Sequence, residues 1–151
     1  MKALILHLLF LISQWPALAQ QTPLHAPLLN VRASFLAFPF TPLLSLELRL
    51  LPHLTMQAET NFWNVHGLNF KAYAHSDLNG PYFFVGNAWV KHRALRQDGG
   101  FSILPYTGVG YAVPFGVGWR ADVRLGAGPM LFSERKGVYP VLKFGIGKWI
   151  I

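Results

Sequence analysis

Residues 119–125 read Trp-Arg-Ala-Asp-Val-Arg-Leu, so that charged and apolar side chains alternate without interruption. Successive side chains of a β-strand point to opposite faces, and this alternation therefore predicts a strand with one polar and one apolar face. The same period of two runs through Leu44–Leu50 and Leu54–Phe62. A helix over Leu43–Leu51 would carry leucine on every side and would have no polar face, so we prefer the strand interpretation there.

Short clusters of Pro, Gly, Asn and Asp separate the alternating stretches and mark the turns between strands. They predict eight strands in one domain, with no length left for a second one. The fold class that we predict is all-β, a transmembrane antiparallel up-and-down β-barrel. The expected strands are Asn30–Phe38, Leu43–Leu51, Leu54–Trp63, Leu68–Ser76, Tyr82–His92, Phe101–Val113, Gly116–Met130 and Pro140–Ile151.

The first 19 residues have the three parts of a secretory signal peptide. Lys2 supplies the positive charge, Ala3–Ile12 is the apolar core, and Ala17-Leu18-Ala19 has the small residues that a signal peptidase accepts. The apolar core is too short to span a bilayer, which takes about 20 residues in a helix. We therefore expect cleavage after Ala19, which leaves residues 20–151 as the barrel domain of an exported protein.

The composition excludes several classes of protein. The chain has 151 residues, of which 52% are hydrophobic and only 13% are charged, against roughly 25% charged in soluble domains. The absence of cysteine excludes disulfides, thiolate metal sites and thiol nucleophiles. The net charge is +7, but the basic residues are scattered, and we predict no binding to nucleic acid.

Alternation alone does not say which face of the barrel is inside. A soluble barrel turns its apolar face inward, whereas an outer-membrane barrel turns it toward lipid. The low charge and the narrow interior of an eight-stranded barrel favour the membrane. So do the connections, which are short near Pro52 and Pro114 but long and charged at Arg93–Gly100 and Leu131–Tyr139. Aromatic residues near the expected strand ends could form the two interfacial girdles: Phe38, Phe62, Trp63, Tyr82, Trp119, Phe132, Tyr139 and Trp149.

The sequence resembles the small eight-stranded outer-membrane β-barrel proteins of Gram-negative bacteria. The resemblance rests on the turn Val113-Pro114-Phe115-Gly116, the strand Trp119–Gly128 that follows it, and the segments Gly80–Gly86 and Pro140–Gly147. It implies an outer-membrane location, contact with membrane lipid and lipopolysaccharide, insertion by the barrel insertion machinery, and a monomer. Such barrels commonly end in Phe, and this chain instead ends in Trp149-Ile150-Ile151.

The strand assignment collects six basic and three acidic side chains on the polar face. One interpretation is an ion-pair network that fills the barrel, since buried charges must be paired; another is an anion site at the excess positive charge. A second group of charged residues lies in the two long loops, where binding residues tend to occur. The predicted interior residues are Arg32, Glu47, Arg49, Glu59, Lys71, Arg120, Asp122, Arg124 and Lys143, and the loop residues are Arg93, Arg96, Asp98, Glu134, Arg135 and Lys136.

No catalytic, cofactor or metal site is expected. His75 and Ser76 are neighbours on one expected strand and would point to opposite faces. Gly108-Val109-Gly110 precedes no helix, so it is not a phosphate-binding loop. We therefore predict a barrel without enzymatic activity that acts as a structural element, or as an adhesin or receptor through its loops. The alternatives are a lipid A or phospholipid-modifying enzyme and a soluble periplasmic barrel that binds a small apolar ligand.

Overall fold

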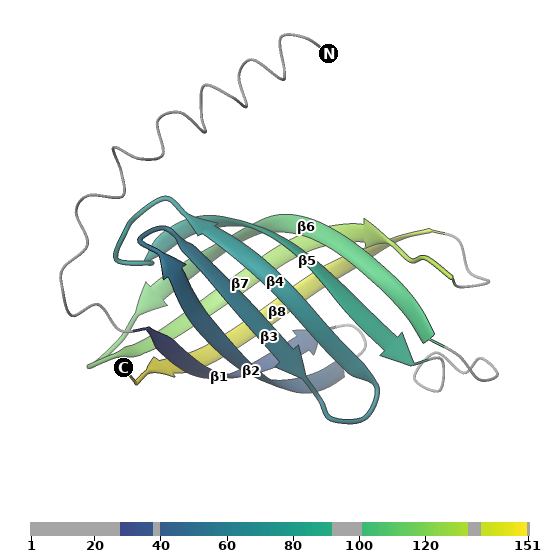
Figure 1. Ribbon diagram of the computed structural model, residues 1–151, viewed down its shortest axis with the longest axis horizontal. Helices are drawn as coiled ribbons and strands as arrows, with labels where there is room; N and C mark the ends of the chain where they lie inside the picture. Colours follow the sequence, from purple (N-terminus) through teal and green to yellow (C-terminus); the bar gives the residue numbers. More distant parts are fainter. Residues whose placement is uncertain (1–27, 38–39, 92–100, 133–136, 151) are drawn as a thin grey trace, which may run out of the picture.

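The computed structural model describes residues 28–37, 40–91, 101–132 and 137–150. Within them the chain forms a closed antiparallel barrel in which each strand pairs with its neighbours in sequence and β1 pairs with β8 (Figure 1). This is the all-β, antiparallel up-and-down barrel of eight strands that the alternation predicts, so the predicted architecture is confirmed. No helix in the described ranges has the length and apolarity to cross a membrane.

The strands begin and end close to the predicted positions. Their bounds are β1 Leu29–Ala37, β2 Phe40–Leu51, β3 Leu54–Thr60, β4 Val65–Tyr73, β5 Gly80–Lys91, β6 Phe101–Pro114, β7 Trp119–Pro129 and β8 Val138–Trp149. β4 differs most, by three residues at each end, and β2, β3 and β7 each differ by three residues at one end. β4 ends at Tyr73, so His75 and Ser76 lie in the following turn and not on a strand, and β7 begins at Trp119 because Phe115–Gly118 forms the turn.

The side chains that face into the barrel are mostly polar, and those that face out are mostly apolar. In β2, Ser45 and Glu47 are buried while Leu44, Leu46 and Leu48 are exposed. The same arrangement holds in β7, where Arg120, Asp122 and Arg124 are buried and the intervening Val123 is exposed. This polarity is the inverse of a water-soluble barrel, in which burial of apolar surface drives folding.

The barrel has two different ends. Both described ends of the chain, Leu28 and Ile150, lie at the end that also carries the turns at residues 52–53, 74–79 and 115–118 (Figure 1). We call this the turn end. The opposite end, which we call the loop end, carries the β1–β2, β3–β4, β5–β6 and β7–β8 connections.

Candidate functional site

Seven charged side chains form one continuous chain through the middle of the barrel. Arg32 bridges two carboxylates, with its Nη2 3.1 Å from Glu47 Oε2 and its Nη1 bound to Asp122. Arg124 bridges the next two, with its Nε 3.3 Å from Asp122 Oδ2 and its Nη2 3.7 Å from Glu59 Oε2. Lys71 ends the chain at Glu47 and Lys143 ends it at Glu59. Positive and negative groups therefore alternate, and each carboxylate lies between two cations.

Each of the three carboxylates also accepts a hydrogen bond from one tyrosine. Tyr73 donates to Glu47 Oε1 at 3.0 Å, Tyr106 donates to Glu59 Oε1 at 3.3 Å, and Tyr82 donates to Asp122. The hydroxyl of Thr55 adds a bond of 2.6 Å to Glu47. Charges removed from water are stable only when such partners replace the water, and these carboxylates have several partners each.

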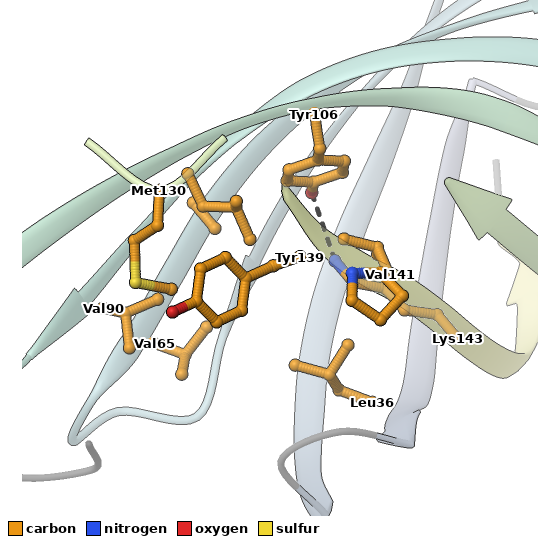
Figure 2. A pocket seen from close by; sticks show the side chains of 11 residues that line it. Leu36, Val65, Val90, Tyr106, Met130, Tyr139, Val141 and Lys143 are labelled. Carbon is orange, nitrogen blue, oxygen red and sulfur yellow. Dashed lines mark hydrogen bonds between the residues drawn. The ribbon is translucent and has the colours of Figure 1, made fainter. Parts of the chain in front are cut away.

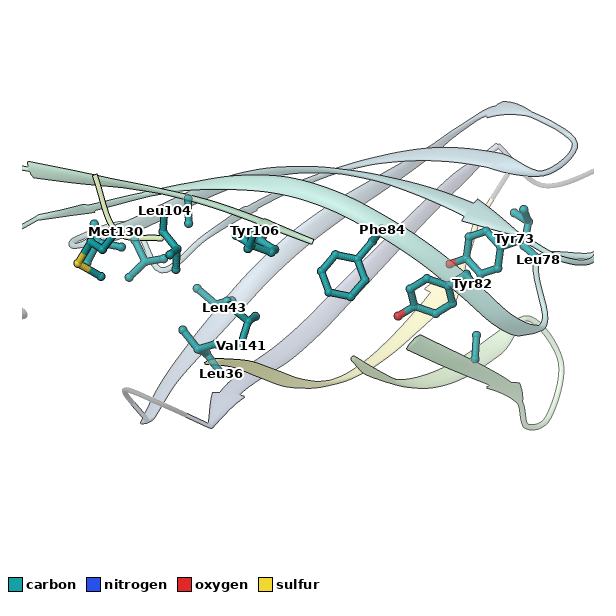
Figure 3. Close-up of a cluster of buried hydrophobic side chains, with 14 of the residues drawn as sticks. Leu36, Leu43, Tyr73, Leu78, Tyr82, Phe84, Leu104, Tyr106, Met130 and Val141 are labelled. Atoms are coloured by element: carbon teal, nitrogen blue, oxygen red, sulfur yellow. The ribbon is translucent and has the colours of Figure 1, made fainter. Parts of the chain in front are cut away.

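The tyrosines belong to a column of four rings along the wall made by β4, β5 and β6. Ring centroids are 4.8 Å apart between Tyr73 and Tyr82, 6.4 Å between Tyr82 and Phe84, and 5.9 Å between Phe84 and Tyr106 (Figure 3). Gly110 lies against the Tyr82 ring, where any side chain would overlap it. Rings on one wall and charges on the other fill the interior, which in an eight-stranded barrel is about one side chain wide in each direction.

Arg49 and Arg120 lie apart from the seven-residue chain and hold the β4–β5 turn instead. The Arg49 guanidinium donates to the carbonyl oxygens of Ser76 at 2.6 Å and Pro52 at 3.1 Å. Arg120 donates to the carbonyl oxygen of Asp77 at 2.9 Å and to Asn79 Oδ1 at 3.0 Å. The carbonyl partners replace carboxylates for these two cations. The sequence analysis placed both arginines in the interior network because they follow the same period of two as the other charged residues. That period does not indicate that the β4–β5 turn folds back over the end of the barrel and contacts them.

The β4–β5 turn closes the turn end of the barrel. Leu78 adopts a left-handed backbone conformation with φ of 60°, and its side chain is only 2% exposed. Asp77 stabilises the turn by accepting bonds from the backbone and side-chain nitrogens of Asn79 at 3.1 and 3.0 Å. Burial acts to raise the pKa of Asp77, but these hydrogen bonds outweigh it and hold the pKa below its ordinary value.

Toward the loop end the interior changes from charged to apolar. A cavity of about 60 Å³ lies there, with Tyr106 and Lys143 at its base and Leu104, Met130 and Val141 among its walls (Figure 2). Lys143 donates to the Tyr106 hydroxyl at 3.1 Å, so the base is hydrogen-bonded and closed (Figure 2). We call this cavity the apolar chamber. Sequence reasoning missed it, although four inward positions near the loop end, Leu36, Val65, Val90 and Val141, carry apolar side chains where the pattern elsewhere places polar ones.

The prediction that aromatic side chains near the strand ends form two outer girdles is partly wrong. Phe62, Trp63, Trp119 and Phe132 are exposed near the ends of strands. Tyr82 and Trp149 instead face into the barrel, and Tyr139 packs against the interior cluster. Tyr82 and Trp149 are on the inward register of their strands, and Tyr82 pairs with a buried carboxylate. Phe38 lies outside the described residues.

The predicted loop residues Arg93, Arg96, Asp98, Glu134, Arg135 and Lys136 all lie outside the described residues, as does the predicted signal peptide. Within the described ranges, no group of three His, Asp or Glu side chains is arranged to hold a metal ion. His53 lies 3.2 Å from the carbonyl oxygen of Tyr73, and His66 lies 2.9 Å from the Thr60 hydroxyl, so both have local partners.

Fold and interior together define a closed eight-stranded antiparallel β-barrel whose core is a chain of ion-paired side chains. No protein-family model, curated protein or solved structure matches the chain.

Proposed function

We propose that this protein is an integral outer-membrane β-barrel that acts as a non-enzymatic scaffold and does not conduct ions. The observation that carries the proposal is the outer face of the barrel. Among the described strand residues, the outward-facing Lys and Arg side chains are Lys91 and Lys148, at the ends of β5 and β8, and no outward-facing residue is Asp or Glu. The rest of that face is dominated by large apolar side chains such as Leu46, Val109 and Leu125, which are 51%, 61% and 59% exposed.

Such a face suits lipid and not water. Soluble monomers rarely expose contiguous apolar patches of more than a few hundred Å², and here apolar side chains alternate outward on all eight strands. A closed barrel also has no unpaired edge strand, as a sheet that spans a membrane requires. The outer face therefore supports membrane insertion and argues against a soluble periplasmic barrel.

Strand length supports the same proposal. A tilted strand needs about 9–11 residues to cross the hydrocarbon core, and seven of the eight strands have between 9 and 14 residues. β3 has 7 residues and continues into the Asn61–Asn64 connection. Exposed Phe62, Trp63 and Phe132 at the loop end, and Phe115 and Trp119 at the turn end, suit the two membrane interfaces.

The filled interior supports a scaffold and not a pore. Arg32, Glu47 and Lys71 are at most 1% exposed, and Leu78 covers the turn end. A water-filled channel would need its lining charges in contact with solvent. The charged side chains of the interior instead form ion pairs with one another, which favours a stabilising role over transport or catalysis.

The test is refolding of the purified chain into phosphatidylcholine vesicles, followed by flotation and by electrophoresis with and without heating. We expect the protein to float with the vesicles, to migrate differently before and after heating, and to add no conductance to a planar bilayer. A chain that folds to a monomer in buffer without lipid or detergent would contradict membrane insertion, and steady single-channel currents would contradict the scaffold role.

A further inference from the structure

The apolar chamber has no role in the ion-pair chain that fills the rest of the interior. Its free volume of about 60 Å³ is several times the roughly 10–15 Å³ that one water needs. Water in such a site needs two to four polar partners. Of the three polar side chains that line the chamber, Lys143 and Tyr106 already bind Glu59 and each other, and the third, Tyr139, supplies one hydroxyl. The chamber therefore favours an apolar occupant.

The shape of the chamber favours a linear occupant. Its lining runs along β8 from Tyr139 to Lys143, a span of four residues, which corresponds to about 10 Å along the axis of a barrel with tilted strands. Its width is that of the interior of an eight-stranded barrel, about one side chain. A single aliphatic chain fits these proportions, whereas a fused ring system or a branched ligand does not.

In the wall of the chamber, the ladder of hydrogen bonds between β6 and the chain after Ala127 is interrupted at one position. Thr107 pairs with Ala127, and beyond the interruption Ile103 and Leu131 exchange two backbone bonds of 3.1 and 2.7 Å. On that register Pro105 lies opposite Pro129, at a position where two N–H donors would complete the ladder. Proline has no N–H, so neither strand can donate to the other there.

The flanking residues fit this interruption. Gly128 lies directly against the Pro105 carbonyl oxygen, where any side chain would overlap it. On the outer face, Asn87 pairs with Pro105 across β5 and β6, and Thr107 follows two residues later, so two polar side chains interrupt an otherwise apolar wall. Leu104 and Met130, which line the chamber, are next to the two prolines in sequence.

We propose that the apolar chamber binds one acyl chain of a surrounding membrane lipid, which passes between β6 and β7 at Pro105 and Pro129 while its headgroup stays at the interface. This rests on the proposed membrane insertion. Because the base of the chamber is a closed hydrogen-bonded pair, the methyl end of the acyl chain enters first and stops above Tyr106 and Lys143.

The experiment uses the full-length mature chain in phosphatidylcholine nanodiscs, with ¹³C-labelled methyl groups on Met, Leu and Val. Nuclear Overhauser contacts to lipid-chain protons are measured at Met130 and Val141 in the chamber and at Leu46 and Val123 on the outer face. We expect contacts at all four residues with protonated lipid chains and at none with chain-deuterated lipid. If Leu46 and Val123 contact lipid while Met130 and Val141 do not, the chamber proposal is overturned and membrane insertion stands. Loss of contacts at Leu46 and Val123 would overturn the proposed function itself.

Matched variants test the chamber and its wall. Ala88→Leu fills the chamber, whereas Ala127→Leu adds the same atoms to the outer face. We expect at least a tenfold loss of the Met130–lipid contact in A88L and none in A127L, with both proteins keeping the heat-dependent gel shift. If A88L does not fold, Val141→Thr places a hydroxyl in the chamber at nearly the same volume and should weaken the contact severalfold.

The double variant Pro105→Ala/Pro129→Ala restores both N–H donors to the β6–β7 ladder. This variant should exclude the lipid chain but still admit free decanoate from the loop end. The decanoate contact at Met130 is measured in nanodiscs of chain-deuterated lipid, so that only decanoate contributes protons. Lipid contacts at Met130 that persist unchanged in this variant would overturn the route. Contacts from decanoate but never from lipid, in the unmodified protein, would overturn membrane lipid as the source.

Discussion

The two halves of the barrel interior are built from the same strands but on different physical principles. Around Asp122, each charged group of the chain lies beside a group of opposite charge, and the turn end is closed by Leu78. Around Met130, side chains touch without polar bonds and leave free space. Removing one member of a buried ion-pair chain leaves charges unpaired in a low dielectric, while changing one apolar wall residue only alters packing. The charged half should therefore be intolerant of substitution, and the apolar half adaptable.

The substitution Asp122→Ala is the strongest test of the expected difference in tolerance between the charged half and the apolar half. The substitution leaves Arg32 and Arg124 without the carboxylate that joins them and removes the acceptor of the Tyr82 hydroxyl. Breaking a buried pair costs about 3–5 kcal/mol, and we expect a loss of that size in urea unfolding from vesicles. Asp77→Ala in the exposed turn is the control, and equal losses in the two variants would contradict the ion-pair chain.

The next largest effect is expected on the outer face. Leu46 points outward near the middle of β2, and arginine at the bilayer midplane of such a barrel costs about 2–4 kcal/mol. Leu46→Arg should lower the folded fraction in vesicles far more than Leu46→Ala does. Similar folded fractions for both variants would mean that this face does not contact lipid.

Closure of the turn end predicts a smaller loss. Leu78→Ala removes a buried side chain from the mouth of the barrel and should cost about 2 kcal/mol, at the low end for buried leucine because the turn can relax. The heat-dependent gel shift should occur at a lower temperature than in the unmodified protein. Leu131→Ala at the exposed loop end is the comparison, and we expect no change there.

The smallest effect is expected in the apolar chamber. Met130→Leu keeps volume and polarity, and swaps of this kind usually cost less than about 1.5 kcal/mol. Unfolding in urea should hardly shift. A loss as large as that of Asp122→Ala would mean that the loop end is as tightly specified as the charged middle.

The alternation of side chains made the barrel and most strand ends predictable, because period two is a local property of the sequence. It also placed Glu47, Glu59 and Asp122 on one face. It could not reveal that Arg49 and Arg120 bind carbonyl groups of the β4–β5 turn, because that contact depends on how a loop folds back in three dimensions. The opposition of Pro105 and Pro129 was equally hidden, since it depends on the register between β6 and β7.

Strand orientation relative to lipid is tested most directly by spin labels at Phe83, Phe84 and Val85 of β5. The chain has no native cysteine, so single cysteines at these positions can be labelled one at a time in the vesicle-bound protein. We expect frequent collisions with oxygen, which concentrates in the bilayer, at 83 and 85, and few at 84, because Phe83 and Val85 are exposed and Phe84 is buried. Collisions of labels 83 and 85 with a water-soluble nickel complex, or high oxygen contact at 84, would contradict an apolar outer face in lipid around a filled interior.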